Sequence, residues 1–231
     1  MRPALLASVA LAMAVTGAAS YFAFLPQNAG TIAFWALAVG PTLVLGAAAA
    51  AWGKREEFLR DWLSPKWGDA TKGVLGAALL FALAWAFARF ATPIGSKYEI
   101  WLVSLYGEIG DPRVLQAHAP AIAGAIASAA LAEEVLWRGA ITQLLARHVG
   151  SRLAWLWAAA LYAIAYVPTA WSLRAMGSGT GLNPVLAMAA LAGGLVWGAM
   201  ARAFGRLIPS VLAHALFDWA VVITFPLWGV R

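Results

Sequence analysis

Two adjacent glutamates and an arginine interrupt an apolar run in the second half of the chain. Glu133, Glu134 and Arg138 follow residues 119–132, which are small or hydrophobic apart from one serine. Such a run is long enough to cross most of a bilayer as a helix, where a charge costs about 2.5–3.5 kcal/mol on insertion scales. Acids at that depth mark functional sites when they face a protein interior or a wet cavity. The pair is therefore a candidate reaction centre.

A second polar pair lies in a later apolar segment, where Asp218 follows His214 by four residues. This spacing puts the two side chains on one face of a helix. After Asp111 the only acidic residues are Glu133, Glu134 and Asp218, and each of them lies in an apolar segment. Solubilising acids belong on surfaces, so solubility does not explain this placement.

These residue types suit hydrolysis by activated water. A carboxylate beside a second carboxylate can take a proton from water, and a histidine with a hydrogen-bonding acid can hold a substrate carbonyl or its oxyanion. The chain contains no cysteine, and no serine adjoins the glutamate pair, so water is the expected nucleophile. A buried ion network that ties helices together, or a proton or ion pathway, is the alternative that these residues leave open.

The composition predicts a membrane protein. Of 231 residues, 63% are hydrophobic and 11% are charged, whereas a soluble domain carries about 25% charged residues. Lysine and arginine outnumber the acids by 16 to 10, but they are scattered at the ends of apolar segments rather than clustered on one face. We therefore expect the lipid bilayer as a partner and no nucleic acid. The oligomeric state stays unknown at this stage.

Apolar runs predict an all-α, polytopic transmembrane helix bundle of seven to eight spans, built as one membrane domain of residues 1–231. Residues 92–118 are expected to form a loop, with residues 101–103 on the membrane surface. The first run could instead be a cleaved signal peptide, but it continues past any cleavage point, which favours a retained helix. The runs cover about residues 3–25, 29–52, 73–90, 119–145, 153–171, 185–204 and 207–228.

Positive charge predicts the orientation. Residues 53–72 form the most polar stretch and are expected to be an amphipathic segment at the membrane surface, broken at Pro65. With the N-terminus inside, this segment is cytoplasmic, because cytoplasmic loops carry the excess of lysine and arginine. The expected location is the cell inner membrane. The inner loops would hold Lys54, Arg55, Arg60, Lys66, Lys72, Arg147, Arg152, Arg202 and Arg206, against Lys97, Arg113, Arg174 and Arg231 outside.

The same segmentation predicts that the two polar pairs lie at the same depth in the membrane. Glu133 would lie about 20 Å from the outer end of its span, and His214 about 10 Å from the inner end of its own, at the rise of an α-helix. In a hydrocarbon core about 30 Å thick these depths coincide. We expect both residues in the inner half of the bilayer.

The two motifs resemble those of a known family. Glu133-Glu134-x-x-x-Arg138 followed by His214-x-x-x-Asp218 is similar to the pattern of the CAAX-protease and bacteriocin-processing (CPBP, or Abi) family of intramembrane endopeptidases. The resemblance covers about residues 119–220. It implies an all-helical membrane bundle in which Glu133 is the general base and Glu134 with Arg138 its supporting pair. It also implies that His214 and Asp218 hold the oxyanion.

One element departs from the family's pattern. The family usually has Phe-x-x-x-His between the two motifs, whereas this chain has Tyr162-Ala163-Ile164-Ala165-Tyr166, so Tyr166 stands where the histidine is expected. Tyrosine can donate a hydrogen bond, but it is a poor general base at its usual pKa of about 10. His118 and His148 fall at span ends and are expected to be interfacial. His214 would be the only imidazole in the site, so no metal and no cofactor is expected.

The predicted function is a metal-independent, glutamic-type intramembrane endopeptidase with Glu133, Glu134, Arg138, Tyr166, His214 and Asp218 in its site. Its substrate would be a membrane-associated polypeptide, such as a C-terminal processing or sorting tail, cut near the inner half of the bilayer. The alternative is a catalytically degenerate relative that acts as a membrane scaffold or partner protein. A small transporter is disfavoured because the chain has no internal repeat and no paired broken helices.

Overall fold

The structure is a computed structural model that describes residues 3–176 and 181–227. Its elements are helices, with no strand among the described residues, which confirms the predicted all-α class. Three π-helical turns extend or join helices at Phe87–Ala91, Glu134–Ile141 and Ala220–Thr224. The α-helices are α1 (Pro3–Ala23), α2 (Ile32–Arg55), α3 (Leu59–Trp62), α4 (Asp69–Ala86), α5 (Lys97–Ile109), α6 (Pro112–Ala117), α7 (Ala119–Glu133), α8 (Thr142–Val149), α9 (Ala154–Ala165), α10 (Thr169–Ser172), α11 (Val185–Phe204) and α12 (Ile208–Trp219).

Within the described residues, 5 helical segments are long and apolar enough to cross a membrane, which identifies a multi-pass membrane protein. The predicted number of seven to eight spans is not confirmed. The run predicted over residues 153–171 shows why, since α9 has only 12 residues and rises about 18 Å, against a hydrocarbon core of about 30 Å. The candidate spans are Leu6–Ala23, Ile32–Arg55, Asp69–Ala91, Ala119–Val149 and Val185–Phe204, with a shorter apolar helix at Ile208–Thr224.

Helices approach closely where a glycine faces its neighbour. A Cβ at Gly46 of α2 would lie 2.5 Å from the side chain of Ala132 in α7. Likewise, a Cβ at Gly73 of α4 would lie 2.6 Å from the side chain of Leu212 in α12. Small residues of this kind let helix backbones come together in lipid, where packing drives association. The α2–α7 contact fixes the end of α7 that carries the glutamate pair.

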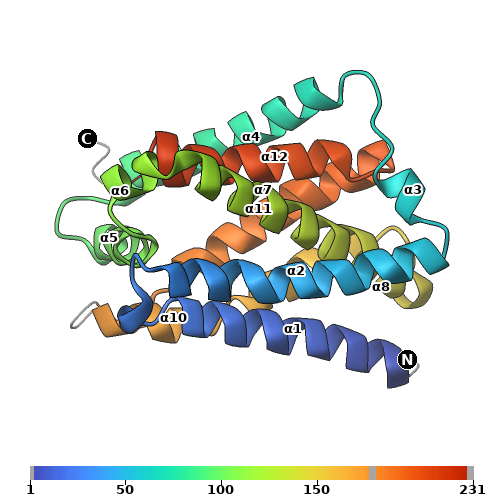
Figure 1. Cartoon of the computed structure of the whole chain (residues 1–231), viewed down its shortest axis with the longest axis horizontal. Coiled ribbons are helices and arrows are strands. Elements are labelled where there is room, and N and C mark those ends of the chain that lie inside the picture. The colour runs from blue at the N-terminus through green and yellow to red at the C-terminus, as the bar shows by residue number, and fades with distance from the viewer. Residues whose placement is uncertain (1–2, 177–180, 228–231) are drawn as a thin grey trace.

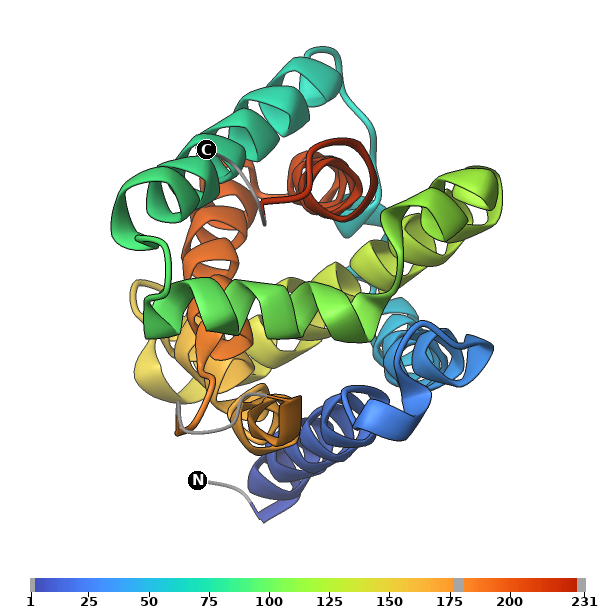
Figure 2. The same ribbon diagram turned by 90° about the vertical axis from the view of Figure 1, so that its left-hand side faces the viewer.

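The bundle has two distinct ends (Figure 1). The N-terminus and α3 lie at one end, whereas α5, α6 and the C-terminal part lie at the other. We call these the α3 end and the α5 end. Seen from its own end, α5 runs across the bundle in front of the other helices (Figure 2).

The prediction of a loop over residues 92–118 is wrong, because this stretch contains α5 and α6. The side chain of Ser96 caps α5 by accepting a hydrogen bond from the backbone N–H of Glu99 at 3.2 Å, as N-caps do. Trp101 and Leu102, predicted at the membrane surface, are buried in the protein. The helix packs its apolar face on the bundle, so its charged residues do not make it a loop.

Residues 53–72 form a folded connection between α2 and α4. Between the end of α2 and the start of α4 they contain the four-residue helix α3. Trp62 at the end of α3 is buried, whereas Trp67 is fully exposed. A Cβ at Gly53 would lie 2.6 Å from the Trp62 ring, and one at Gly139 would lie 2.9 Å from it. The segment therefore covers the α3 end of the bundle. Its cytoplasmic placement, and the assignment of residues 1–231 to one domain, stay predictions.

Candidate active site

The two glutamates lie where α7 changes into a π-helical turn. α7 ends at Glu133, and the turn Glu134–Ile141 leads on to α8. Such turns are rare inside helices and occur frequently at functional sites. Glu133 and every residue of the turn are buried. Both carboxyl groups and Arg138 thus lie inside the protein, as the high cost of a charge in lipid requires.

Two tyrosine hydroxyls hold the Glu133 carboxylate. Tyr162 donates a hydrogen bond to Oε2, and Tyr166 donates to Oε1 at 2.8 Å. The tyrosines are four residues apart, so they project from the same side of α9 and its C-cap, and their ring centroids lie 5.2 Å apart. Tyr166, a predicted site residue, therefore contacts the predicted base. Tyr162 had no predicted role, although its spacing from Tyr166 was a signal that could have found it.

His214 of α12 contacts the acids through both ring nitrogens. Its Nδ1 lies 3.1 Å from Glu134 Oε1, and because an ionised carboxylate only accepts, we assign a proton to Nδ1. Its Nε2 lies 3.4 Å from Asp218 Oδ2 and 4.0 Å from Glu133 Oε2. The structure therefore brings the two polar pairs into contact.

Arg138 lies close to the same oxygen of Glu134 that His214 contacts. Its Nη1 lies 3.2 Å from Glu134 Oε1. The guanidinium carbon is 4.5 Å from the centroid of the Tyr162 ring and 5.1 Å from that of the Trp197 ring. A desolvated cation over an aromatic face gains about 2 kcal/mol. Arg138 thus balances the charge of Glu134 and packs against the tyrosine that holds Glu133.

Trp197 of α11 orients the imidazole of His214. The two rings stack with centroids 3.6 Å apart and an interplanar angle of 16°. A Cβ at Gly193, one turn earlier, would lie 2.6 Å from the Trp197 ring, so glycine leaves room for the indole. Nothing in the spacing of residues 185–204 distinguishes this tryptophan from ordinary core packing, which is why it was not predicted.

A cavity of about 440 Å³ adjoins these residues. Most of its wall is aliphatic or aromatic, and Glu134 and Arg138 lie outside the wall. The 4.0 Å between Glu133 Oε2 and His214 Nε2 is too long for a hydrogen bond, whereas a water oxygen about 2.8 Å from both atoms would bridge them. The site residues in the wall are Glu133, Tyr162, Tyr166, His214 and Asp218.

The remaining histidines lie away from this site. His118 is at the junction of α6 and α7, and His148 is in the last turn of α8, and both are exposed. Over residues 3–176 and 181–227, no group of three or more His, Cys, Asp or Glu side chains could hold a metal ion. A single imidazole without a thiolate is a poor donor set for zinc.

Comparison with known families finds one match. Residues 115–220 match the family model described as Rce1-like, Type II CAAX prenyl endopeptidase Rce1-like. No curated protein and no solved structure matches the chain. The matched segment contains both polar motifs, from Glu133 to Asp218, and the tyrosines between them. Over these residues the chain is therefore similar to the Rce1-like CAAX protease family, which is the CPBP family that its motifs resemble.

Proposed function

We propose that this chain is a glutamic-type intramembrane endopeptidase in which Glu133 activates the attacking water. The observation that carries the proposal is the setting of the Glu133 carboxylate. It borders an apolar cavity, accepts hydrogen bonds from Tyr162 and Tyr166, and lies 4.0 Å from His214 Nε2. The match of residues 115–220 to a protease family model supports hydrolytic activity. The proposed location is the cell inner membrane.

For each step of peptide hydrolysis, a side chain of the site lies close enough to the cavity to act. Glu133 takes a proton from water as the water oxygen attacks the peptide carbonyl carbon. The developing oxyanion accepts a hydrogen bond from His214 Nε2–H, while Nδ1–H stays on Glu134. Glu133 then returns the proton to the amide nitrogen as the C–N bond breaks, which releases a carboxylic acid and an amine. Asp218, 3.4 Å from Nε2, orients that N–H toward the cavity.

The charge of the cavity favours an internal peptide bond. The described residues that line it include Glu133 and Asp218 but no lysine or arginine. The doubly protonated His214 already faces Glu134 and Asp218, so the described lining residues hold no further cation to pair with the terminal carboxylate of a substrate, whereas an internal bond carries no charge. We propose a membrane-associated polypeptide as the substrate, cut at a C-terminal processing or sorting tail.

The test is direct cleavage. The protein is purified, reconstituted in liposomes and incubated with membrane-anchored candidate tail peptides, and the products are read by mass spectrometry. We expect two fragments whose masses sum to that of the peptide plus one water. Intact peptides throughout, with the protein folded, would count against the endopeptidase.

The alternative is a catalytically degenerate family member that acts as a membrane scaffold or partner. The observation that favours it is Tyr166, which occupies the position of the family's histidine and cannot serve as an efficient base near neutral pH. Under this alternative the tyrosine pair and Glu133 form a structural network between α7 and α9. The two functions therefore predict different effects on the rate of cleavage when the tyrosines are replaced.

Removing either hydroxyl is expected to slow cleavage. Tyr162→Phe and Tyr166→Phe each delete a hydrogen bond to an ionised group, worth about 1.5–3 kcal/mol, so kcat should fall by about 10- to 100-fold. Tyr21→Phe, on α1 and outside the cavity wall, is the matched control and should be neutral. An inert wild type that gains turnover with Tyr166→His would instead support the degenerate member.

Activity is expected to survive metal chelators. The proposed mechanism uses Glu133 and His214 alone for proton transfer and charge stabilisation, and no suitable donor set for zinc occurs in the described residues. Cleavage rates are measured before and after dialysis against a strong chelator, with metal content determined on the same samples. Loss of stoichiometric zinc together with activity, restored by added zinc, would contradict this prediction.

A further inference from the structure

The cavity lies in one part of the bundle, toward the α5 end. On α1 its wall begins at Thr16 and continues to Phe24 after the helix, and on α2 it ends at Thr42. On α12 it begins at His214 and continues toward the C-terminus. α1 and α12 run toward the α5 end, whereas α2 runs away from it (Figure 1). The lining residues of all three helices therefore lie in the part of the bundle nearer the α5 end. Glu133 and His214 therefore form the floor of a cavity that extends toward α5.

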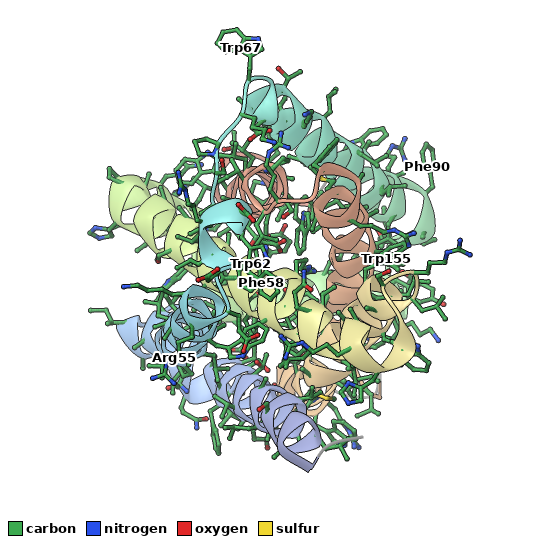
Figure 3. All side chains as sticks on the ribbon, turned by 90° about the vertical axis from the view of Figure 1, so that its right-hand side faces the viewer. Arg55, Phe58, Trp62, Trp67, Phe90 and Trp155 are labelled. Atoms are coloured by element: carbon green, nitrogen blue, oxygen red, sulfur yellow. The ribbon has the colours of Figure 1, made fainter. Side chains whose placement is uncertain are left out.

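The opposite end is covered by packed side chains. Phe58 stacks on Trp62 with ring centroids 5.9 Å apart, and Figure 3 shows both residues over the middle of the α3 end. The backbone N–H of Leu207 donates to the Trp62 carbonyl at 2.8 Å, and the buried ion pair of Arg206 with Asp69 lies beside it. None of these residues lines the cavity. A substrate approaching from the α3 end would meet this layer before Glu133.

At the other end, α5 both roofs the cavity and joins the segments around it. Leu102, Leu105 and Tyr106 of α5 line the cavity. The Tyr106 hydroxyl donates to the Val221 carbonyl at 2.7 Å and accepts from the backbone N–H of Leu227 at 3.0 Å. These contacts join α5 to the π-helical turn that follows α12 and to Leu227 beyond it. The cavity is thus separated from the α5 end by one short helix.

Charge distinguishes the same two ends. Basic residues near the α5 end are Arg89, Lys97, Arg113 and Arg174. Because cytoplasmic segments carry the excess of lysine and arginine, the α3 end is the cytoplasmic one and the α5 end faces away from the cytoplasm. The basic residues near the α3 end are Lys54, Arg55, Arg60, Lys66, Lys72, Arg147, Arg152, Arg202 and Arg206.

We infer that the active site is reached from the extracytoplasmic side of the membrane. Its substrate is an apolar, membrane-anchored segment of a polypeptide that enters the cavity from the extracytoplasmic side, as after export, and reaches Glu133 at the cavity floor. The apolar wall suits such a segment, because burying apolar side chains there needs no charged partner. This inference rests on the proposed endopeptidase function, and it adds the side from which the substrate comes.

Accessibility of a cysteine in the cavity tests the inference without any need for turnover. The chain has no cysteine, so Ala129→Cys, one turn before Glu133 in the cavity wall, provides a single thiol. Lys66→Cys and Arg113→Cys, both exposed, report the α3 and α5 ends. Each variant is treated with a small cationic, membrane-impermeant methanethiosulfonate in right-side-out and in inside-out vesicles.

We expect Ala129→Cys and Arg113→Cys to react in right-side-out vesicles, and Lys66→Cys only in inside-out vesicles. The difference between the two preparations should be at least about tenfold in rate, corresponding to about 1.4 kcal/mol in accessibility. Labelling of Ala129→Cys from the same side as Lys66→Cys, or from neither side, overturns the inference.

The peptide assay is run on the same variants. Cleavage combined with labelling from the Lys66 side rejects only the direction of access, whereas absent cleavage with labelling from the Arg113 side rejects only the endopeptidase.

Discussion

Glu133→Gln is expected to abolish cleavage while the protein stays folded. The amide keeps the shape of the carboxyl group but cannot take a proton from water, and positioned acid–base groups typically contribute about 10²–10⁴-fold to rate. A tyrosine hydroxyl both donates and accepts, so either Tyr162 or Tyr166 can turn to accept from the new N–H. The loss should therefore appear in kcat with little change in thermal unfolding.

Glu108→Gln is the matched control for this substitution. Glu108 is a fully buried glutamate in α5, outside the cavity wall, and burial raises the pKa of its carboxyl group to about 7. Replacing it tests whether exchanging any buried carboxyl group impairs the enzyme. We expect this variant to retain cleavage. Turnover that persists in Glu133→Gln would end the glutamic mechanism, whatever the control shows.

The residues that the structure brings together are those whose spacing carried information in the sequence. Glu133 and Glu134 were recognisable because charges interrupt an apolar run, and His214 with Asp218 because four residues separate them within a second run. The structure brings these residues together. The catalytic roles assigned to them stay predictions. Trp197 was not predictable, because its contact with His214 depends on how α11 packs on α12.

The predicted number of spans is not confirmed, and the fifth apolar run shows one physical reason. An apolar run continues past Tyr166, but α9 ends at Ala165, where Pro168 lies shortly downstream. Proline has no backbone N–H, and it disfavours helical geometry in the residue before it. Hydropathy alone therefore overestimates the length of this helix. Pro168 is therefore the signal in the sequence that indicates a helix shorter than the apolar run over residues 153–171.

The prediction of a loop over residues 92–118 is wrong because the charged residues of this stretch favoured a loop, whereas its apolar residues have the spacing of a helix. Apolar residues recur at intervals of three to four in this stretch, which is typical of an amphipathic helix. They are Trp101, Leu102, Leu105, Tyr106 and Ile109. Lys97 and Glu99 belong to the first turn of this helix. α5 runs across the end of the bundle (Figure 2), and its Leu102, Leu105 and Tyr106 line the cavity. The prediction of a loop concealed the element that roofs the proposed active site.

His214→Ala is expected to lower kcat by about 10²–10³-fold, the usual loss when one oxyanion donor is removed. The donor acts in the transition state, so KM should change little. Glu134 and Arg138 still pair in this variant, which keeps the buried charge balanced. His148→Ala, on the exposed face of α8, is the matched control and should be neutral.

The space left by the imidazole offers a second readout. Trp197 stacks on the ring in the wild type, so free imidazole can take the same position against the indole and donate to the oxyanion. Added imidazole should therefore restore part of the lost kcat in His214→Ala but not in Glu133→Gln, because the latter lacks the base. An unchanged kcat with a raised KM in His214→Ala would mean that the histidine binds substrate without stabilising the transition state, and the oxyanion role would have to be abandoned.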